Sequence, residues 1–279
     1  MKCSRPYLTA MLVCVGLWAT SDTIQAGTLP TPPPGPARIA TADAVVVGKV
    51  EEIEPDDIKV GTTTYSIALV RISDGIMGIK KEKTLRVAFI PEPKPKGMGF
   101  IVVTNPRPLQ LEIGNAGLFI LKKQDKETFY TIAGMVGCYL SDKKKDFEKD
   151  IQTAKTTVKV MDNPLAALKS KDAEERLLAA TLLVEKHRTF RGPDSKQEPI
   201  DADESKLILQ VIADADWTTQ WDFSSLRPIP GQLFQRLGIT KTDGFTPPAD
   251  GNFQSAAQAW MRENAQKYII QRFVAGEKK

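Results

Sequence analysis

A thiol nucleophile and a histidine base could come from only one cysteine and one histidine. His187 is the single histidine of the chain, and Cys138 is the single cysteine beyond residue 14. A thiol nucleophile needs its base within hydrogen-bond reach, and nothing in the sequence brings these two residues together. Cys138 follows Gly137 in an apolar stretch, where cysteine usually behaves as a small buried hydrophobe. One histidine also excludes zinc sites built from several histidines. We therefore predict a protein that is not an enzyme and has no catalytic, cofactor-binding or metal-binding residues.

Two acidic stretches, 201–205 and 214–218, begin like calcium-binding loops. The first has Lys206 where such a loop needs glycine and Ile212 where it needs the closing glutamate. The second has Thr219 and Ser225 at those places. Neither stretch meets the requirements of a calcium site. The acids of the first are instead expected to cap a helix that begins near Glu204.

Aromatic and acidic residues alternate between 214 and 223. Trp217, Trp221 and Phe223 stand beside Asp214, Asp216 and Asp222. Such a surface suits a sugar, and Trp217, Trp221 and Asp222 are the candidate contacts. The alternative is that the tryptophans fill a seam between helices, which is the commoner use of this residue.

A proline and lysine segment, 91–99, offers a second candidate surface. Lys94 and Lys96 alternate there with Pro91, Pro93 and Pro95, so the segment cannot pair in a sheet. Lys94 and Lys96 are candidate contacts for a protein partner. The alternative is a stiff, solvated connection between strands.

Composition and charge exclude several functional classes. Of 279 residues, 42% are hydrophobic and 26% are charged, which is typical of a soluble globular protein. The length suggests two domains. The net charge of +4 would fall to +3 without Lys2, Arg5 and Asp22. This balance produces no strong field for nucleic acid or an anionic membrane, so we expect no nucleic-acid partner.

The N-terminus has the pattern of a secretory signal peptide over residues 1–26. Lys2 and Arg5 precede the apolar run Leu8–Ala19, and Ala26 supplies a small residue for cleavage. The run is too short for a mature anchor, so we expect export to the periplasm or outside the cell, with no stable membrane span. An uncleaved anchor is the alternative. After cleavage, Cys138 would be the only cysteine, and no internal disulfide could form.

Residues 27–42 are expected to form a linker. Five prolines between Thr28 and Arg38 favour an extended, polyproline-like chain. A proline-motif ligand is the alternative.

Residues 43–141 are expected to form a small antiparallel β-barrel. Alternating apolar residues and turn signals predict strands over 44–53, 62–73, 83–90, 100–105, 110–113, 116–122, 129–133 and 135–140. The apolar start of the first strand predicts burial on both of its faces. Gly48 within that strand predicts a bend, a bulge or a close backbone approach.

The order of these elements resembles the netrin-module or tissue-inhibitor-of-metalloproteinase type of OB-fold barrel. The resemblance rests on Asp43–Val50, on Ile72–Gly78 running into an alternating strand, and on Leu111–Gly114 before Leu118–Leu121. It implies the barrel only. In those inhibitors an N-terminal cysteine reaches the zinc of the target enzyme, whereas this chain would begin at Gly27 and lacks paired cysteines.

Residues 142–279 change to helical periodicity and are expected to form an all-α domain. Phe147, Ile151, Ala154, Val158 and Met161 lie on one helical face, which we expect to contact the barrel. Asn163 and Asp172 are expected to cap the next helices. Residues 165–180 resemble a HEAT-type repeat, although no second copy follows. Further helices are expected over 204–215, 230–237 and 252–274.

The sequence thus predicts an exported α+β protein with an OB-like barrel followed by a helical domain. We expect a non-catalytic binding or scaffolding protein of the cell envelope that acts through contacts with an unknown protein partner. A carbohydrate or cell-wall binder that uses Trp217–Phe223 is one alternative. A hydrolase with a site built from loops is the other.

Overall fold

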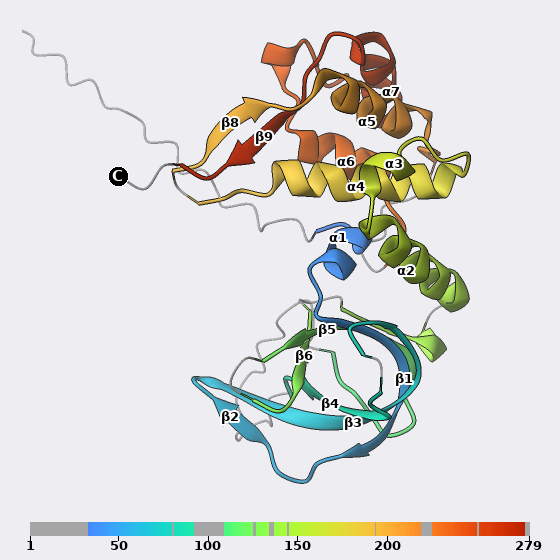
Figure 1. The fold of residues 1–279 in the computed structure, drawn as a ribbon, viewed down its shortest axis with the longest axis vertical. Coiled ribbons are helices and arrows are strands. Elements are labelled where there is room, and N and C mark those ends of the chain that lie inside the picture. The colour runs from blue at the N-terminus through green and yellow to red at the C-terminus, as the bar shows by residue number, and fades with distance from the viewer. Residues whose placement is uncertain are drawn as a thin grey trace, which may run out of the picture. The chain divides into compact units, whose positions relative to one another are not determined.

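The computed structural model describes residues 33–79, 81–91, 109–124, 127–133, 137–143, 145–192, 194–218, 225–249 and 251–276. The chain divides into two units, residues 1–31 and 32–279. The expected signal peptide lies outside the described residues. The described chain combines one large sheet with helices, in agreement with an α+β protein (Figure 1).

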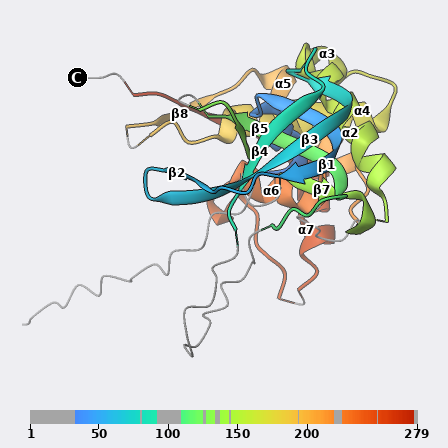
Figure 2. The same cartoon turned by 90° about the horizontal axis from the view of Figure 1, so that it is seen from below.

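The large sheet has seven strands and mixed strand directions. Its strands are β1 (Ala44–Ile53), β2 (Ile58–Val60), β3 (Thr63–Met77), β4 (Thr84–Phe89), β5 (Ala116–Lys123), β6 (Tyr130–Ile132) and β7 (Cys138–Leu140). Pairing runs in a cycle from β1 to β3, β4, β6, β5 and back to β1. β2 forms a hairpin with β3 (Figure 2). The expectation of a purely antiparallel sheet was wrong, because β6 pairs in parallel with β4. β6 folds back along β5 as an antiparallel partner, and this direction is the one in which β4 runs.

The start of β1 and the middle of β5 are buried on both faces. On β1, Val45 belongs to one hydrophobic cluster and Val46 to another. On β5, Leu118 belongs to the same cluster as Val45, and Phe119 belongs to the same cluster as Val46. The two-sided burial expected for the first strand is therefore confirmed. Of the bend, bulge or close approach expected at Gly48, the structure shows a bulge, because the register against β3 shifts between Val47 and Gly48.

The predicted segment 110–113 is not a strand. Residues 113 and 114 form a turn, and the backbone N–H of Glu112 donates to the Asn115 side chain at 2.8 Å. This local hydrogen bond competes with strand pairing. The predicted segment 100–105 lies outside the described residues.

The helices are α1 (Gly35–Ala40), α2 (Phe147–Met161), α3 (Pro164–Ala167), α4 (Ala173–Arg188), α5 (Ala202–Asp214), α6 (Pro230–Leu237) and α7 (Phe253–Asn264). The caps expected at Asn163 and Asp172 are confirmed, since each side chain accepts a hydrogen bond from a backbone N–H of its helix. Within the described residues, no helix has the length and apolar character that crossing a membrane requires.

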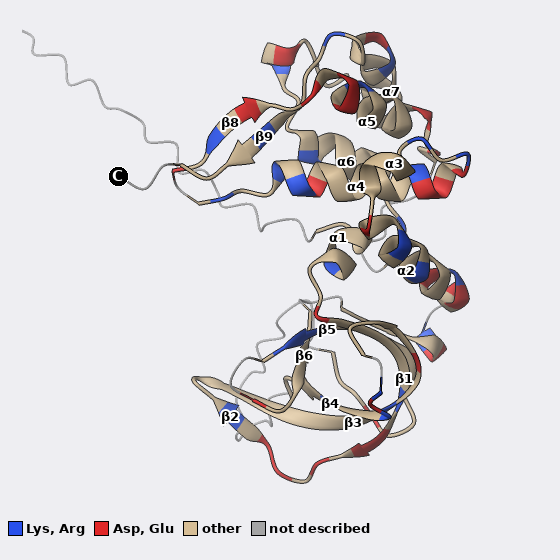
Figure 3. Cartoon of the chain, in the orientation of Figure 1, with Lys and Arg blue, Asp and Glu red and all other residues tan. Residues whose placement is uncertain are grey.

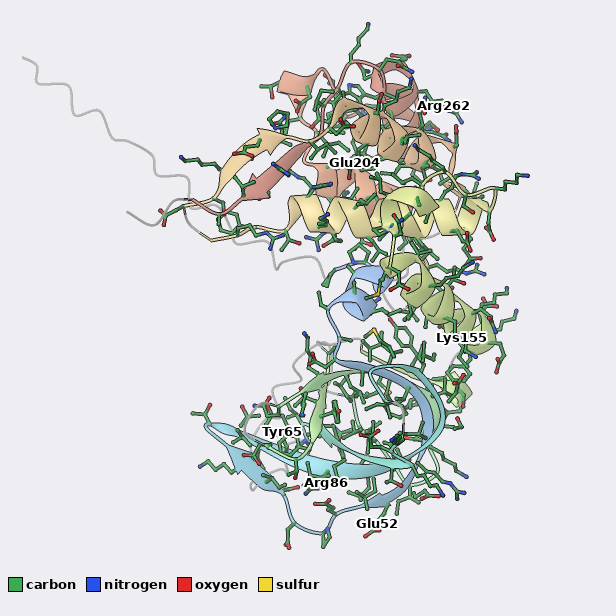
Figure 4. All side chains as sticks on the ribbon, viewed as in Figure 1. Glu52, Tyr65, Arg86, Lys155, Glu204 and Arg262 are labelled. Atoms are coloured by element: carbon green, nitrogen blue, oxygen red, sulfur yellow. The ribbon has the colours of Figure 1, made fainter. Side chains whose placement is uncertain are left out.

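Sheet and helices share a hydrophobic cluster, as expected for the helix over 147–161. Ala154 of α2 packs with Leu118 and Ile120 of β5 and with Ile39 of α1. At the edge of this contact, Lys155 of α2 forms an ion pair with Asp74 of β3 at 2.7 Å (Lys155 is labelled in Figure 4).

The extended linker expected over 27–42 is corrected at its C-terminal end, because Gly35–Ala40 is helical. A proline is tolerated in the first turn of a helix, where its missing N–H is not needed, and Pro36 occupies that place. Five of the six residues of α1 are buried. The tight fit is clearest at Gly35, where an added Cβ would lie 2.3 Å from the carbonyl oxygen of Leu226.

The expected all-α character of residues 142–279 is also corrected. Strands β8 (Lys196–Pro199) and β9 (Gln271–Val274) pair antiparallel in a second sheet. The helix predicted over 252–274 ends at Asn264, whose side-chain amide donates to the carbonyl of Trp260 at 2.8 Å. Ser205 then holds the chain beyond it, since its hydroxyl donates to Tyr268 and accepts from the N–H of Ile270.

Candidate functional site

Cys138 and His187 are not brought together as a catalytic pair. Cys138, in β7, packs against the hydrophobic cluster inside the sheet. The residue keeps some exposure, but burial of its thiol raises the pKa to about 12, which keeps the sulfur protonated near neutral pH. His187 is buried at the end of α4, and its Nε2 lies 2.8 Å from Oε1 of Glu204 in α5. The histidine therefore connects two helices.

The acidic stretches serve local structure. The side chain of Asp201 accepts from the N–H groups of Asp203 and Glu204, which confirms that it caps a helix. Asp216 accepts from the N–H and hydroxyl of Thr218, and these hydrogen bonds lower its pKa. In the described part of the chain, no three His, Cys, Asp or Glu side chains are grouped closely enough to hold a metal ion.

The candidate sugar contacts are only partly described. Trp217 is 7% exposed, and its indole N–H donates to the carbonyl of Ile212 at 2.9 Å. It therefore fills a seam at the end of α5 and offers no stacking face. Trp221 and Asp222 lie outside the described residues, as do the candidate partner contacts Lys94 and Lys96.

The outward face of β3 and β4 carries a neutralised arginine. Arg86 donates to both carboxylate oxygens of Glu54 at 2.7 Å and to the hydroxyl of Thr128 at 2.6 Å. The pair lowers the pKa of Glu54 and raises that of Arg86. Beside it, the ring of Tyr65 lies 6.0 Å from the buried ring of Phe129 (Tyr65 and Arg86 are labelled in Figure 4). Among the described residues of this face, Arg86 is engaged by Glu54 and the ring of Tyr65 contacts Phe129, so neither is free to bind single-stranded nucleic acid.

An apolar depression, here called the aromatic hollow, lies where α6 meets the N-terminus of α7. It has a volume of about 330 Å³ and is lined by Phe234, Gln235, Ile239, Thr240, Lys241, Phe245, Pro247 and Phe253. The ring centroids of Phe234 and Phe245 are 4.8 Å apart, and that of Phe253 is within 6 Å of both. These edge-to-face contacts hold the walls in place. Lys241 supplies the one charge among the described residues of the lining.

A second depression, here called the ionic cavity, lies between the start of α4 and the end of α5. Its volume is about 450 Å³, and it is lined by Ala173, Glu174, Arg176, Leu177, Val211, Asp214, Ala215, Asp216, Arg227 and Pro228. Charges of both signs thus surround an apolar floor. Elsewhere, basic and acidic residues are interspersed along both sheet and helices (Figure 3).

Sequence reasoning missed both depressions. The members of the aromatic hollow come from positions 234–253 without a common period, and the ionic cavity joins residues some 55 positions apart. The sequence draws attention to Asp214 and Asp216, but as the start of a possible calcium loop and as neighbours of the tryptophans.

Comparison with known proteins does not assign this chain to a family. No protein family matches the chain, and no curated protein resembles its sequence closely enough to count as a relative.

Proposed function

We propose that this chain is an exported, non-catalytic binding or scaffolding protein of the cell envelope that acts through protein–protein contacts. The aromatic hollow is the observation that carries the proposal. Its walls are preformed by rings that contact one another, so little side-chain entropy is lost when an apolar group inserts. Aromatic residues are also enriched where proteins contact one another.

The occupant that fits the aromatic hollow is an extended peptide with an apolar side chain next to a carboxylate. The apolar side chain would fill the space between Phe245, Phe253 and Pro247, and the carboxylate would pair with Lys241. Proline-rich peptides bind aromatic-lined grooves in the same general way.

We further infer that the large sheet is an OB-type barrel that carries the helical part. The cyclic order of pairing and the parallel β4–β6 pair support this inference. The ion pairs of Arg86 with Glu54 and of Arg71 with Glu51 support a use other than nucleic-acid binding, because they neutralise cations on the outward face of β3 and β4.

Capture from envelope extract with matched variants tests the aromatic hollow. We expect Phe253→Ala and Lys241→Glu to reduce recovery of the partner about tenfold or more, since interface anchors carry most of the binding free energy. The controls are Phe190→Ala, at an exposed phenylalanine outside the hollow, and Lys169→Glu. Equal recovery with all four variants, each shown to be folded by circular dichroism, would contradict the proposal.

Export is tested by the N-terminus of the protein isolated from cells. The expected result is a chain that begins at Gly27, found in the periplasm or medium, because Lys2, Arg5 and the apolar run to Ala19 direct secretion. Recovery of an intact N-terminus from the cytoplasm would refute export. Mass spectrometry of fractionated cells makes the measurement.

A further inference from the structure

The ionic cavity contains a carboxylate in a position that a helix disfavours. Asp214 is the last residue of α5, where the helix dipole opposes a negative charge, and the last turn of α5 has no basic residue. Residues that break such a local rule are often retained for function. A cation placed in the cavity would be attracted by both the Asp214 carboxylate and the negative end of the dipole.

The cavity also contains the guanidinium group of Arg227, which forms no ion pair with another described residue, although its charge contributes to lowering the pKa of Asp146. Arg176 is already engaged, because its Nη1 donates to the carbonyls of Ser170 and Lys171. Arg227 is exposed, and its backbone N–H is held by the Ser225 hydroxyl next to the buried Pro228. A guanidinium group pairs well with a carboxylate through two parallel hydrogen bonds.

The floor between these charges is apolar. Leu177 of α4 and Val211 of α5 line it, and both are partly buried against the main helical cluster. No aromatic side chain belongs to the described lining, so stacking against a sugar ring has no platform there. A volume of about 450 Å³ falls in the range of small-ligand sites.

We propose that the ionic cavity binds a small zwitterionic ligand, namely an amino acid or short peptide with free ends and an aliphatic side chain. Asp214 receives the ammonium group, Arg227 receives the carboxylate, and Leu177 and Val211 contact the aliphatic part. This inference is independent of the proposed function, because the ionic cavity and the aromatic hollow share no lining residue.

Titration calorimetry with three probes separates the two charged contacts. L-leucine has both charges, leucinamide keeps only the ammonium group, and N-acetyl-leucine keeps only the carboxylate. We expect Asp214→Asn to lower the affinity for L-leucine and leucinamide about tenfold and to leave the affinity for N-acetyl-leucine unchanged. We expect Arg227→Gln to lower the affinity for L-leucine and N-acetyl-leucine by a similar factor and to leave the affinity for leucinamide unchanged.

The matched controls are Asp203→Asn, at the opposite end of α5, and Arg262→Gln on α7 (Arg262 is labelled in Figure 4). Both controls should bind L-leucine like the parent protein, because neither residue lines the cavity. The proposal is overturned if neither L-leucine nor leucyl-leucine binds the parent protein at millimolar concentration. It is also overturned if Asp214→Asn and Arg227→Gln affect the three probes alike.

Discussion

Replacing Leu118 with alanine is expected to lower the free energy of unfolding by about 3 kcal/mol. Leu118 is fully buried on the face of β5 that contacts the helices, in the cluster that includes Ile39 of α1 and Ala154 of α2. Truncation there removes apolar contacts and leaves a cavity between sheet and helices. Urea unfolding, followed by circular dichroism and by tryptophan fluorescence, measures the loss.

Leu165→Ala is the matched control for this prediction. Leu165, in α3, is 46% exposed, so the same truncation should cost less than about 1 kcal/mol. Trp217 and Trp260 belong to the helical cluster, and their fluorescence reports on that part of the chain. If sheet and helices stabilise each other through the shared cluster, Leu118→Ala shifts both signals together. A shift in circular dichroism with unchanged fluorescence would contradict that coupling.

Replacing Arg236 with alanine is expected to lower the free energy of unfolding by about 2–3 kcal/mol at pH 7. Arg236 of α6 forms an ion pair with Glu185 of α4, with Nε and Oε1 3.1 Å apart. Burial raises the pKa of Glu185, and the charge of Arg236 partly opposes that rise. Without the arginine, the carboxylate would be left in a poorly solvated place without its partner, which is costly.

The cost of Arg236→Ala should depend on pH. A carboxyl whose folded pKa is raised contributes stability that is fully present below its usual value, near 4.5, and is lost as the pH rises through the folded pKa. Removal of Arg236 raises that pKa further. The difference from the parent protein should therefore be small near pH 4.5 and grow toward pH 7. Urea titrations across this range measure it.

Two variants control for the role of the carboxylate. In Glu185→Gln the part of the pH dependence that comes from this carboxyl should disappear. Arg262→Ala, at an exposed arginine of α7, should cost less than about 0.5 kcal/mol at every pH. An equal loss for Arg236→Ala at pH 4.5 and pH 7 would show that packing, and not charge, holds Arg236 in place.

The sequence alone determined the elements whose signals are local. Strand β1 and helices α2 and α6 have the predicted bounds, because alternation, helical spacing and the stop at Gly238 all lie within the segments themselves. Gly238 adopts a φ of 70°, as a glycine that ends a helix commonly does. The helix caps Asn163, Asp172 and Asp201 were readable for the same reason.

Only the tertiary structure decided features that join distant residues. β8 has no apolar alternation, and it becomes a strand because β9, about 75 positions later, supplies its hydrogen bonds. The contact between His187 and Glu204, the aromatic hollow and the ionic cavity depend in the same way on which elements meet. The local sequence pattern indicates how a segment buries its own side chains. A site, in contrast, is formed by side chains from distant segments, and only tertiary packing brings these together.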